Sequence, residues 1–502
     1  MSRYGGKKML NGEAVIEIKN LGRVFKKNWA LRGINLEINK GELFGIVGPD
    51  GSGKTTLIQS LCAILDPTEG SIRVNGFDTV KDSSKITSRI GYMSQAYSLY
   101  EDLTVEENLE FFAKVRNIPE ENFIERKKRL LEFSGLSPFL KRRVRHLSGG
   151  MQKKLALCCN LIHEPDLLIL DEPTLGVDPI SRRHLWKMIA EYHSLGKTII
   201  LSTSYMDEAK RCGRLAFLLE GRLLSCERPD AFGKDMEDVF IANIKKVEWK
   251  RTLPFPRRLT EGDIIRVEGL SKRFDAFTAV DKIGFTIKRG EVFGFVGPNG
   301  SGKTTTIRIL CGIIPPSDGQ VEVAGVDVVR RPADVKGKIG YMSQKFSLYI
   351  DLTIEENINF FGRVYGVDAK SLEERKGWLL EIAGLKGKEK ALTKEVSGAV
   401  RQRLALGCSL LHHPDILFLD EPTAGVDPAS RRAFWEMIGL LAKSGTTVFV
   451  TTHYLSEVEA CSRIAFLHQG RILALDAPER LKAIYNTDSL EDIFMQVMEG
   501  NA

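Results

Sequence analysis

The sequence predicts an α/β protein made of two tandem copies of one unit. The chain has 502 residues, which is more than a single hydrophobic core usually organises. It aligns with itself without a gap at an offset of 249 residues, as between Gly48 and Gly297. Short apolar runs rich in Val, Ile and Phe end in glycine turns and are followed by helical patterns. A repeat this long indicates two whole globular domains rather than a solenoid.

The repeat sets the predicted domain bounds. The register fails after Phe232, and a stretch rich in Lys and Arg follows, with Pro254 and Pro256 to stiffen it. We interpret this stretch as a surface linker, with a basic contact to lipid headgroups or to a partner as the alternative. The predicted parts are a tail (1–14), a first domain (15–243), a linker (244–263) and a second domain (264–502).

Composition narrows the protein class. With 43% hydrophobic and 27% charged residues, the chain is expected to be globular rather than disordered or fibrous. It contains no apolar run of the roughly 18 to 20 residues that cross a bilayer, and Met1 to Glu13 lack the apolar core of a secretion signal. We therefore expect a cytoplasmic protein that reaches a membrane only through a separate membrane protein.

Charge and cysteines point to no further site. A net charge of +7 suits anionic lipid headgroups or RNA, but on a chain of this size it usually reflects solvated surface. We expect no nucleic acid partner. The eight cysteines form no C-x-x-C pair, and pairs such as Cys62 with Cys311 recur at the repeat offset. This pattern favours buried, reduced thiols over disulfides or zinc.

Within each copy the strand and helix signals separate into two regions. Leu43 to Gly48 and Val292 to Gly297 are apolar strands that end in a glycine-rich turn and a helix. From Thr104 to Lys154 the pattern is mostly helical. We therefore expect an α/β core and a separate helical subdomain in each copy.

The glycine-rich turns are phosphate-binding loops. Gly48 to Thr55 and Gly297 to Thr304 both match G-x-x-x-x-G-K-[ST] between a strand and a helix. Such glycines let backbone N–H groups surround phosphate oxygens, and the helix N-terminus and the lysine add positive charge. Two matches at the repeat offset make a simple glycine turn a poor explanation. The ATP-binding residues predicted here are Gly48, Gly51, Ser52, Gly53, Lys54, Thr55, Thr56, Gly297, Gly300, Ser301, Gly302, Lys303, Thr304 and Thr305.

Each copy also carries an acidic pair at the end of an apolar strand. The strand from Leu167 ends in Asp171 and Glu172, and the strand from Ile416 ends in Asp420 and Glu421. Behind a phosphate loop, the first acid can reach Mg²⁺ and the second can polarise the attacking water as a general base. An N-cap would explain one acid, but not a pair in both copies.

These features together resemble the ATP-binding cassette (ABC) superfamily, because Ser148 to Gln152 matches its signature motif. The resemblance implies a P-loop NTPase fold in each copy, with a RecA-like α/β core, an antiparallel β subdomain and a helical subdomain. It implies ATP and Mg²⁺ as ligands. Two nucleotides would lie between the P-loop of one cassette and the signature motif of the other.

The resemblance assigns further roles residue by residue. Gln95 and Gln344 stand at the Q-loop position, Asp178 and Asp427 at the D-loop, and His453 at the switch histidine. Phe25 and Phe274 stand where the family stacks an aromatic ring on adenine, although each alone could be a core residue. The implied catalytic residues are Glu421, His453, Gln344, Glu172 and Gln95. The implied metal-site residues are Thr55, Gln95, Asp171, Thr304, Gln344 and Asp420. The implied signature residues are Ser148, Gly149, Gly150, Ser397 and Gly398.

The two copies differ at the motifs. Ala399 replaces the second signature glycine of the second copy, and Ser204 replaces the switch histidine of the first. If the cassettes pair head to tail, both departures fall on the site that contains Lys54, Glu172 and Ser397. The other site, with Lys303, Glu421 and Ser148, is complete. We expect the complete site to hydrolyse ATP and the other to turn over slowly; the alternative is that both sites work.

Tandem cassettes occur in several functional classes of protein, and features of this sequence favour some classes over others. The linker is short and broken by proline, unlike that of ribosome-acting ATPases, and the gapless repeat has no room for the coiled coils of chromosome and repair ATPases. Sugar importers have similar length. The runs from Tyr92 to Gln95 and from Gly176 to Arg183 look like those of ABC-2 type exporters of the drug-resistance group.

An exporter ATPase implies partners encoded elsewhere. The resemblance implies two membrane-spanning ABC-2 permease subunits and export of drugs, lipids, polysaccharide or ions. Residues 96–100 and 345–349 after the Q-loop glutamines are partly aromatic and suit a short helix of such a partner. We expect a location on the inner face of the cell membrane.

Overall fold

The structure is a computed structural model that describes residues 13–26, 28–96, 98–232, 262–275, 277–344, 347–424, 426–455 and 457–499. They fall into two compact units, one made of residues 13–177 and 181–232 and one made of 262–499 together with 178–180. The linker predicted for 244–263 lies almost wholly outside the described residues. None of the helices in these ranges is both long and apolar enough to cross a bilayer.

Each unit contains two sheets. In the first, an antiparallel sheet has the strand order β2-β1-β4-β5 and a core sheet has the order β10-β9-β3-β8-β7-β6. All neighbours in the core sheet are parallel except β9 and β10. The second unit repeats both sheets, with β12-β11-β14-β15 and β16-β17-β18-β13-β19-β20. The predicted α/β core and antiparallel β subdomain are therefore confirmed.

The strands β3 and β13 form because five consecutive apolar or glycine residues are buried on both faces of a parallel sheet. The bounds in the first unit are β1 (Ala14–Phe25), β2 (Asn28–Asn39), β3 (Leu43–Val47), α1 (Lys54–Leu61), β4 (Glu69–Val74), β5 (Phe77–Asp78), α2 (Ser83–Thr87), β6 (Ile90–Met93), α3 (Val105–Val115), α4 (Glu120–Ser134), η1 (Ser137–Phe139), η2 (Val144–His146), α5 (Gly149–Leu161), β7 (Leu167–Asp171), α6 (Pro179–Ser194), β8 (Thr198–Thr203), α7 (Met206–Ala209), β9 (Arg214–Leu219), β10 (Arg222–Glu227) and η3 (Pro229–Phe232).

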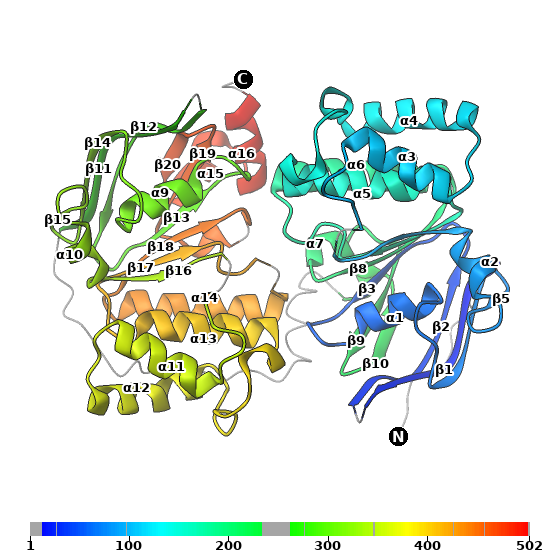
Figure 1. Cartoon of the computed structure of the whole chain (residues 1–502), viewed down its shortest axis with the longest axis horizontal. Coiled ribbons are helices and arrows are strands. Elements are labelled where there is room, and N and C mark those ends of the chain that lie inside the picture. Colours follow the sequence, from blue (N-terminus) through cyan, green and yellow to red (C-terminus); the bar gives the residue numbers. More distant parts are fainter. Residues whose placement is uncertain are drawn as a thin grey trace. The chain divides into compact units, whose positions relative to one another are not determined.

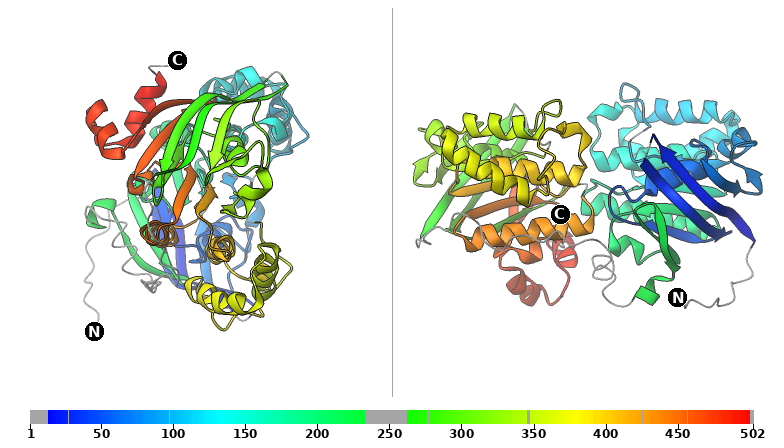
Figure 2. Two further views of the ribbon diagram at one scale, coloured as in Figure 1. Left: turned by 90° about the vertical axis from the view of Figure 1, so that its left-hand side faces the viewer. Right: turned by 90° about the horizontal axis from the view of Figure 1, so that it is seen from below.

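The second unit repeats this order and adds two helices at its end. Figure 2 shows these helices, α15 and α16, side by side in red, and α16 contacts β20. The bounds are β11 (Asp263–Phe274), β12 (Phe277–Lys288), β13 (Val292–Val296), α9 (Lys303–Leu310), β14 (Asp318–Val323), β15 (Val326–Asp327), α10 (Pro332–Lys336), β16 (Ile339–Met342), α11 (Ile354–Val364), α12 (Ala369–Ile382), η4 (Thr393–Glu395), α13 (Gly398–Leu410), β17 (Ile416–Asp420), α14 (Pro428–Lys443), β18 (Thr447–Thr452), η5 (Val458–Ala460), β19 (Arg463–His468), β20 (Arg471–Asp476), α15 (Pro478–Tyr485) and α16 (Leu490–Glu499).

The helices are layered against the core sheet. Figure 1 shows α11 to α14 on one side of β16 to β18, and β11, β12 and β14 on the other side with α9 between the sheets. The predicted helical region in the first unit is α3, α4 and α5, which confirms the helical subdomain. The second half of α5, from Leu155, is buried on all sides, because it packs against α3, α4 and β6.

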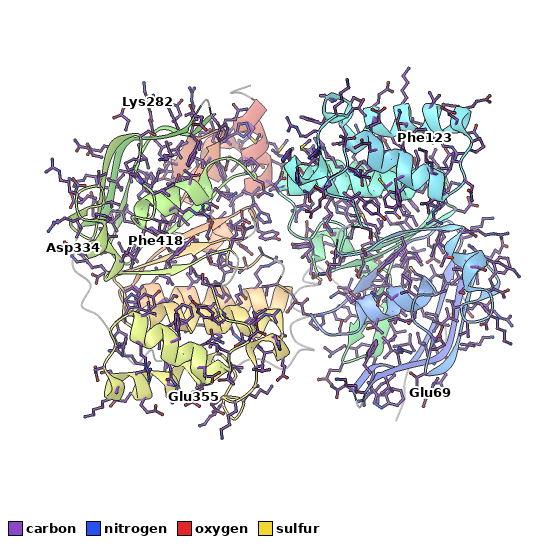
Figure 3. All side chains as sticks on the ribbon, viewed as in Figure 1. Glu69, Phe123, Lys282, Asp334, Glu355 and Phe418 are labelled. Atoms are coloured by element: carbon purple, nitrogen blue, oxygen red, sulfur yellow. The ribbon has the colours of Figure 1, made fainter. Side chains whose placement is uncertain are left out.

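An apolar core lies between the two sheets of each unit. In the second unit it is aromatic: Phe285 and Phe293 stack with ring centroids 5.5 Å apart, and Phe449 lies 5.7 Å from Phe293. Phe418 on β17, labelled in Figure 3, belongs to the same cluster and is fully buried, and its ring centroid lies 5.6 Å from that of Phe449. This rigid core supports the carboxyl ends of the strands, where the motifs lie.

Candidate nucleotide-binding and ATPase site

Four motifs of each cassette meet at one edge of its core sheet. In the first cassette the P-loop follows β3, the switch residue follows β8, the acidic pair ends β7 and the Q-loop follows β6. These strands are adjacent and parallel, in the order β3-β8-β7-β6. Parallel strands place their carboxyl ends at one edge, where ligands of open α/β sheets bind.

The P-loops require glycine for steric reasons. A Cβ at Gly48 would lie 2.4 Å from the carbonyl oxygen of Leu218, and one at Gly297 would lie 2.2 Å from that of Leu467. Gly53 and Gly302 adopt φ of 104° and 106°, where a side chain is strained. These turns place backbone N–H groups at the N-termini of α1 and α9. This is the arrangement that binds phosphate.

The P-loop lysines lie over their own loops. Lys303 Nζ donates to the carbonyl oxygen of Gly297 at 2.7 Å, and it lies 3.2 Å from Glu421 Oε1. Lys54 makes the same bond to Gly48 at 2.7 Å and lies 3.4 Å from Glu172 Oε1. Both lysines are buried, so each ammonium is held by carbonyl and carboxylate oxygens that phosphate oxygens can replace.

In the second cassette Glu421 is the centre of a charged cluster. Gln344 Nε2 donates to Glu421 Oε2 at 3.0 Å, and His453 Nδ1 lies 3.1 Å from the same oxygen. Burial raises the pKa of Glu421, but the histidine and Lys303 outweigh it and hold that pKa at about 2. Glu421 is therefore ionised at neutral pH, as a general base must be.

The first cassette replaces this cluster with hydroxyl and backbone bonds. Ser204 Oγ donates to Glu172 Oε1 at 2.9 Å, and the backbone N–H of Ser204 donates to Glu172 Oε2 at 3.1 Å. Gln95 contributes its carbonyl oxygen, which accepts a bond of 3.3 Å from Lys153 Nζ. The carboxylate is thus held in place without an imidazole.

Both glutamates have an unusual backbone. Glu172 and Glu421 each have φ of 48°, a left-handed conformation that is uncommon for a residue with a side chain. The N–H of Glu172 donates to Ser202 Oγ at 2.9 Å, and that of Glu421 to Thr451 Oγ1 at 3.0 Å. Such strain persists only where surrounding bonds enforce it, which is typical of functional sites.

The aspartates have oxygen neighbours suited to a divalent cation. Asp420 Oδ1 accepts bonds from Thr304 Oγ1 at 3.2 Å and from Thr451 Oγ1 at 2.7 Å, and burial raises its pKa. Asp171 Oδ1 accepts from Ser202 at 2.5 Å, while its buried Oδ2 has no hydrogen-bond partner among the described residues. Hydroxyl and carboxylate oxygens of this kind are ligands that Mg²⁺ prefers.

The signature serines are N-caps. Ser148 Oγ accepts from the N–H of Met151 at 3.3 Å at the start of α5, and Ser397 Oγ accepts from Val400 at 3.4 Å at the start of α13. Both serines are exposed. Phe25 and Phe274 are 43% and 46% exposed, so they lie on the surface and are not core residues.

Lys153 is a site residue that the motif analysis missed. It is 1% exposed and donates to the carbonyl oxygens of Gln95 and Glu172, each at 3.3 Å. Burial lowers its pKa to about 8, although Glu172 and Asp171 oppose the shift. At the matching repeat position the second cassette has the uncharged Gln402, which donates to the carbonyl oxygen of Pro422. A lysine opposite a glutamine at the repeat offset is the sequence signal for this difference.

Comparison with known proteins decides the family. The family model described as ABC transporter matches residues 31–175 and 280–424. The chain belongs to the ABC transporter ATP-binding family. It is 38% identical, over 96% of this chain and 97% of the relative, to the probable multidrug ABC transporter ATP-binding protein YbhF of Escherichia coli K12. It is 31% identical to a putative ABC transporter ATP-binding protein of Methanosarcina acetivorans, over 88% of this chain and 86% of the relative.

A solved structure matches both cassettes of this ABC ATPase. It is the archaeal ribosome recycling factor aABCE1 in complex with the ribosomal stalk protein aP1, with 20% identity, a TM-score of 0.66 and coverage of 93% of this chain and 92% of that chain. At this identity the likeness shows the tandem ABC fold alone. A model of an AAA domain also matches residues 397–459, within the second cassette. As an ABC ATPase, the chain binds and hydrolyses ATP, and proteins of this kind work with membrane permease subunits.

Proposed function

We propose that this ABC ATPase drives an ABC-2 type exporter from the inner face of the cell membrane, with two permease subunits encoded elsewhere. The likeness to YbhF along 96% of the chain supports this proposal, because it includes both cassettes. That relative's name supports a drug cargo, and the cargo that we propose is drugs or other hydrophobic or ionic substrates. Two ATP molecules close the pair of cassettes, and loss of the γ-phosphate opens them.

Hydrolysis is assigned to the site built on the second cassette. The observation that carries this assignment is the cluster in which Gln344, His453 and Lys303 all face the Glu421 carboxylate. Glu421 would accept the proton of the attacking water, Lys303 would hold the outer phosphates, and His453 would contact the γ-phosphate. The signature residues Ser148, Gly149 and Gly150 would complete this site from the first cassette.

The first cassette would bind ATP and turn it over slowly. Its P-loop is intact, so Lys54 and the backbone N–H groups can still hold phosphates. Ser204 is shorter than histidine, and its hydroxyl already donates to Glu172. It therefore cannot supply a cationic donor to the γ-phosphate. The signature of this site would be Ser397 and Gly398, with Ala399 in place of glycine.

The residues present also fit Mg²⁺. Thr55, Gln95 and Asp171 would hold it in the first cassette, and Thr304, Gln344 and Asp420 in the second. The buried Asp171 Oδ2 without a partner and the contact of Thr304 with Asp420 support this assignment. When bound, Mg²⁺ neutralises phosphate charge that develops during transfer.

An exposed aromatic pair in each cassette supports a permease contact. Tyr349 and Phe360 are 49% and 38% exposed and pack edge to face at 4.8 Å. Tyr100 and Phe111 form the same pair at 4.5 Å in the first cassette. Each pair lies just beyond a Q-loop, and we assign to it a short helix of the permease. Tyr97, Lys345 and Phe346 of the predicted contact lie outside the described residues.

In each pair, hydrogen bonds from a buried asparagine hold the backbone of the tyrosine. The buried side chain of Asn357 accepts from the N–H of Tyr349 at 2.9 Å and donates to its carbonyl oxygen at 2.8 Å. Asn108 bonds Tyr100 in the same two ways, at 3.0 and 3.1 Å. The aromatic rings are thus presented by an ordered loop, which lowers the entropy cost of binding a partner.

Affinity purification from the native host tests the proposal. Tagged chain carrying Glu421→Gln, which traps ATP if the assignment is right, should retain an integral membrane protein with several spans. A sugar importer partner would copurify with a soluble solute-binding protein. Recovery of ribosomes without any membrane protein would contradict the exporter assignment and favour the ribosome-associated alternative.

A further inference from the structure

A buried carboxylate lies beneath the switch segment of the second cassette. Glu457 is 4% exposed. Its Oε1 accepts from Thr423 Oγ1 at 2.6 Å, and its Oε2 accepts from Thr452 Oγ1 at 2.9 Å. Thr452 directly precedes His453, and Thr423 follows Glu421 by two residues. One carboxylate therefore connects the two segments that carry the histidine and the glutamate.

Arg431 of α14 adds three contacts to this connection. Its Nε lies 3.3 Å from Glu457 Oε1, and its Nη2 donates to the carbonyl oxygen of Val426 at 3.2 Å. Its guanidinium lies 5.0 Å from the ring centroid of Tyr454, and that ring lies 4.1 Å from the ring of His453. Arg431 thus contacts the D-loop segment, the buried carboxylate and the ring beside the switch histidine.

The position of the main chain at His453 depends on the same group. Thr452 Oγ1 donates to Glu457 and also accepts from the N–H of Tyr454 at 2.9 Å. The residue between Thr452 and Tyr454 is His453. The backbone of His453 is therefore held between Thr452 and the Tyr454 N–H that binds the Thr452 hydroxyl. The Glu457 carboxylate in turn orients that hydroxyl.

Burial of the Glu457 carboxylate costs free energy, so its presence requires an explanation. Burial raises the pKa of Glu457, while Arg431 and the threonine hydroxyls act in the opposite direction. A buried ion pair adds little stability compared with apolar packing, but it defines geometry because its groups cannot be left unpaired. The Arg431–Glu457 pair is therefore better explained by a role in positioning neighbouring groups than by a contribution to stability.

The first cassette provides an internal comparison. Glu208 is equally buried and keeps the bonds from two threonine hydroxyls, at 2.5 and 2.7 Å. Arg182, which matches Arg431, pairs at 3.5 Å with Asp207, a residue 53% exposed. At the position of Asp207 the second cassette has Ser456, which lies outside the described residues. Arg182 also acts on the buried Glu208, whose pKa it lowers against the effect of burial, and its guanidinium lies 5.5 Å from the centroid of the Tyr205 ring. The first cassette therefore has a similar arrangement, but its arginine also pairs with Asp207 and a serine stands in place of the histidine.

We propose that Arg431 and Glu457 are positioning residues that hold the His453 imidazole against Glu421 during ATP hydrolysis by the second cassette. This inference rests on the proposed roles of His453 and Glu421. It predicts a defect in turnover without a matching defect in ATP binding, because the P-loop contacts of Lys303 are independent of the pair.

Steady-state ATPase kinetics of the whole chain test the proposal. Glu457→Gln should lower kcat about ten- to hundredfold, the scale of a small misplacement in an active site, and leave the KM for ATP within about twofold. The matched variant Glu208→Gln in the first cassette should change kcat by less than about threefold. In a His453→Ala background, Glu457→Gln should lower kcat no further, because the group that it positions is gone.

The outcomes separate this proposal from the one beneath it. Independent, multiplying losses in the double variant, or an unchanged kcat in Glu457→Gln, would overturn the positioning role. Equal losses in Glu457→Gln and Glu208→Gln would overturn it too. If His453→Ala alone keeps full activity, the proposed site assignment fails first. Should Glu457→Gln not fold, Arg431→Met decides by the same cycle, since it leaves the two threonine bonds to Glu457 in place.

Discussion

The hydroxyl group of Ser204 donates a 2.9 Å hydrogen bond to the Glu172 carboxylate. In the second cassette the matching contact is between His453 Nδ1 and Glu421, at 3.1 Å. Both residues face the glutamate, but only the histidine can carry a positive charge and reach beyond it with a second nitrogen. The serine therefore preserves the resting geometry of the glutamate, but it lacks the imidazole that we propose as a donor to the γ-phosphate.

Removal of the two glutamates should have unequal effects. Glu421→Gln removes the ionised carboxylate that we propose as the general base, and we expect ATPase activity to fall at least about hundredfold. Glu172→Gln should lower it less than about threefold. Steady-state phosphate release by purified chain measures both. The reverse ranking would contradict the assignment of hydrolysis to the second cassette, and equal losses would indicate that both sites work.

Restoring the missing groups should activate the slow site. In a chain that carries Glu421→Gln, adding Ser204→His and Ala399→Gly places an imidazole near Glu172 and a second glycine in the signature motif. We expect the residual ATPase rate to rise at least about tenfold, because one well-placed transition-state donor is worth about a hundred- to thousandfold. Ser204→His alone serves as the intermediate control. No increase in either variant would show that another feature limits the first site.

The sequence was sufficient to find the repeat and to place the P-loop motifs and the acidic pairs at strand ends, because each motif directly follows or ends an apolar strand. The strand from Leu43 to Val47 and the helical region from Thr104 to Lys154 have the predicted type. These elements depend on local patterns of apolar residues and glycine, which a single copy already contains.

Contacts between distant strands were beyond the sequence analysis. Ser202 and Thr451 bind the acidic pairs from a neighbouring strand, about thirty residues away along the chain. Lys153 reaches the Q-loop from the signature helix. No fixed spacing in the sequence reveals these contacts. The first depends on strand order, and the second depends on how α5 packs.

Lys153 should make stability depend on pH in a defined direction. Its pKa falls from the ordinary 10.5 to about 8 in the folded chain. Between these values the unfolded chain holds the proton more tightly, so the contribution of Lys153 to the free energy of unfolding should rise as pH increases from about 8 to 10.5. The rise should be on the order of 3 kcal/mol. Below pH 8 both states are protonated and the contribution is constant.

Urea unfolding at a series of pH values measures this effect as a difference between chains. Lys153→Gln, which reproduces the residue at Gln402, should lack the rise. Lys187→Gln, a change at an exposed lysine of α6, should keep it. A rise of equal size in Lys153→Gln would mean that another group carries the proton.

The aromatic pairs should be needed for assembly with the permease and not for ATP hydrolysis by the isolated chain. Tyr349→Ala removes half of an exposed pair whose neighbour, Phe360, then loses its edge-to-face contact. Aromatic anchors of this type often contribute 2 kcal/mol or more to an interface, so we expect recovery of the membrane subunit to fall at least about tenfold. Basal ATPase should stay within about twofold, because Tyr349 lies outside the cluster around Glu421.

Tyr100→Ala tests the first cassette in the same way, and exposed Val329→Ala on the opposite subdomain is the control. Unchanged recovery in the Tyr349→Ala, Tyr100→Ala double variant would place the permease contact elsewhere.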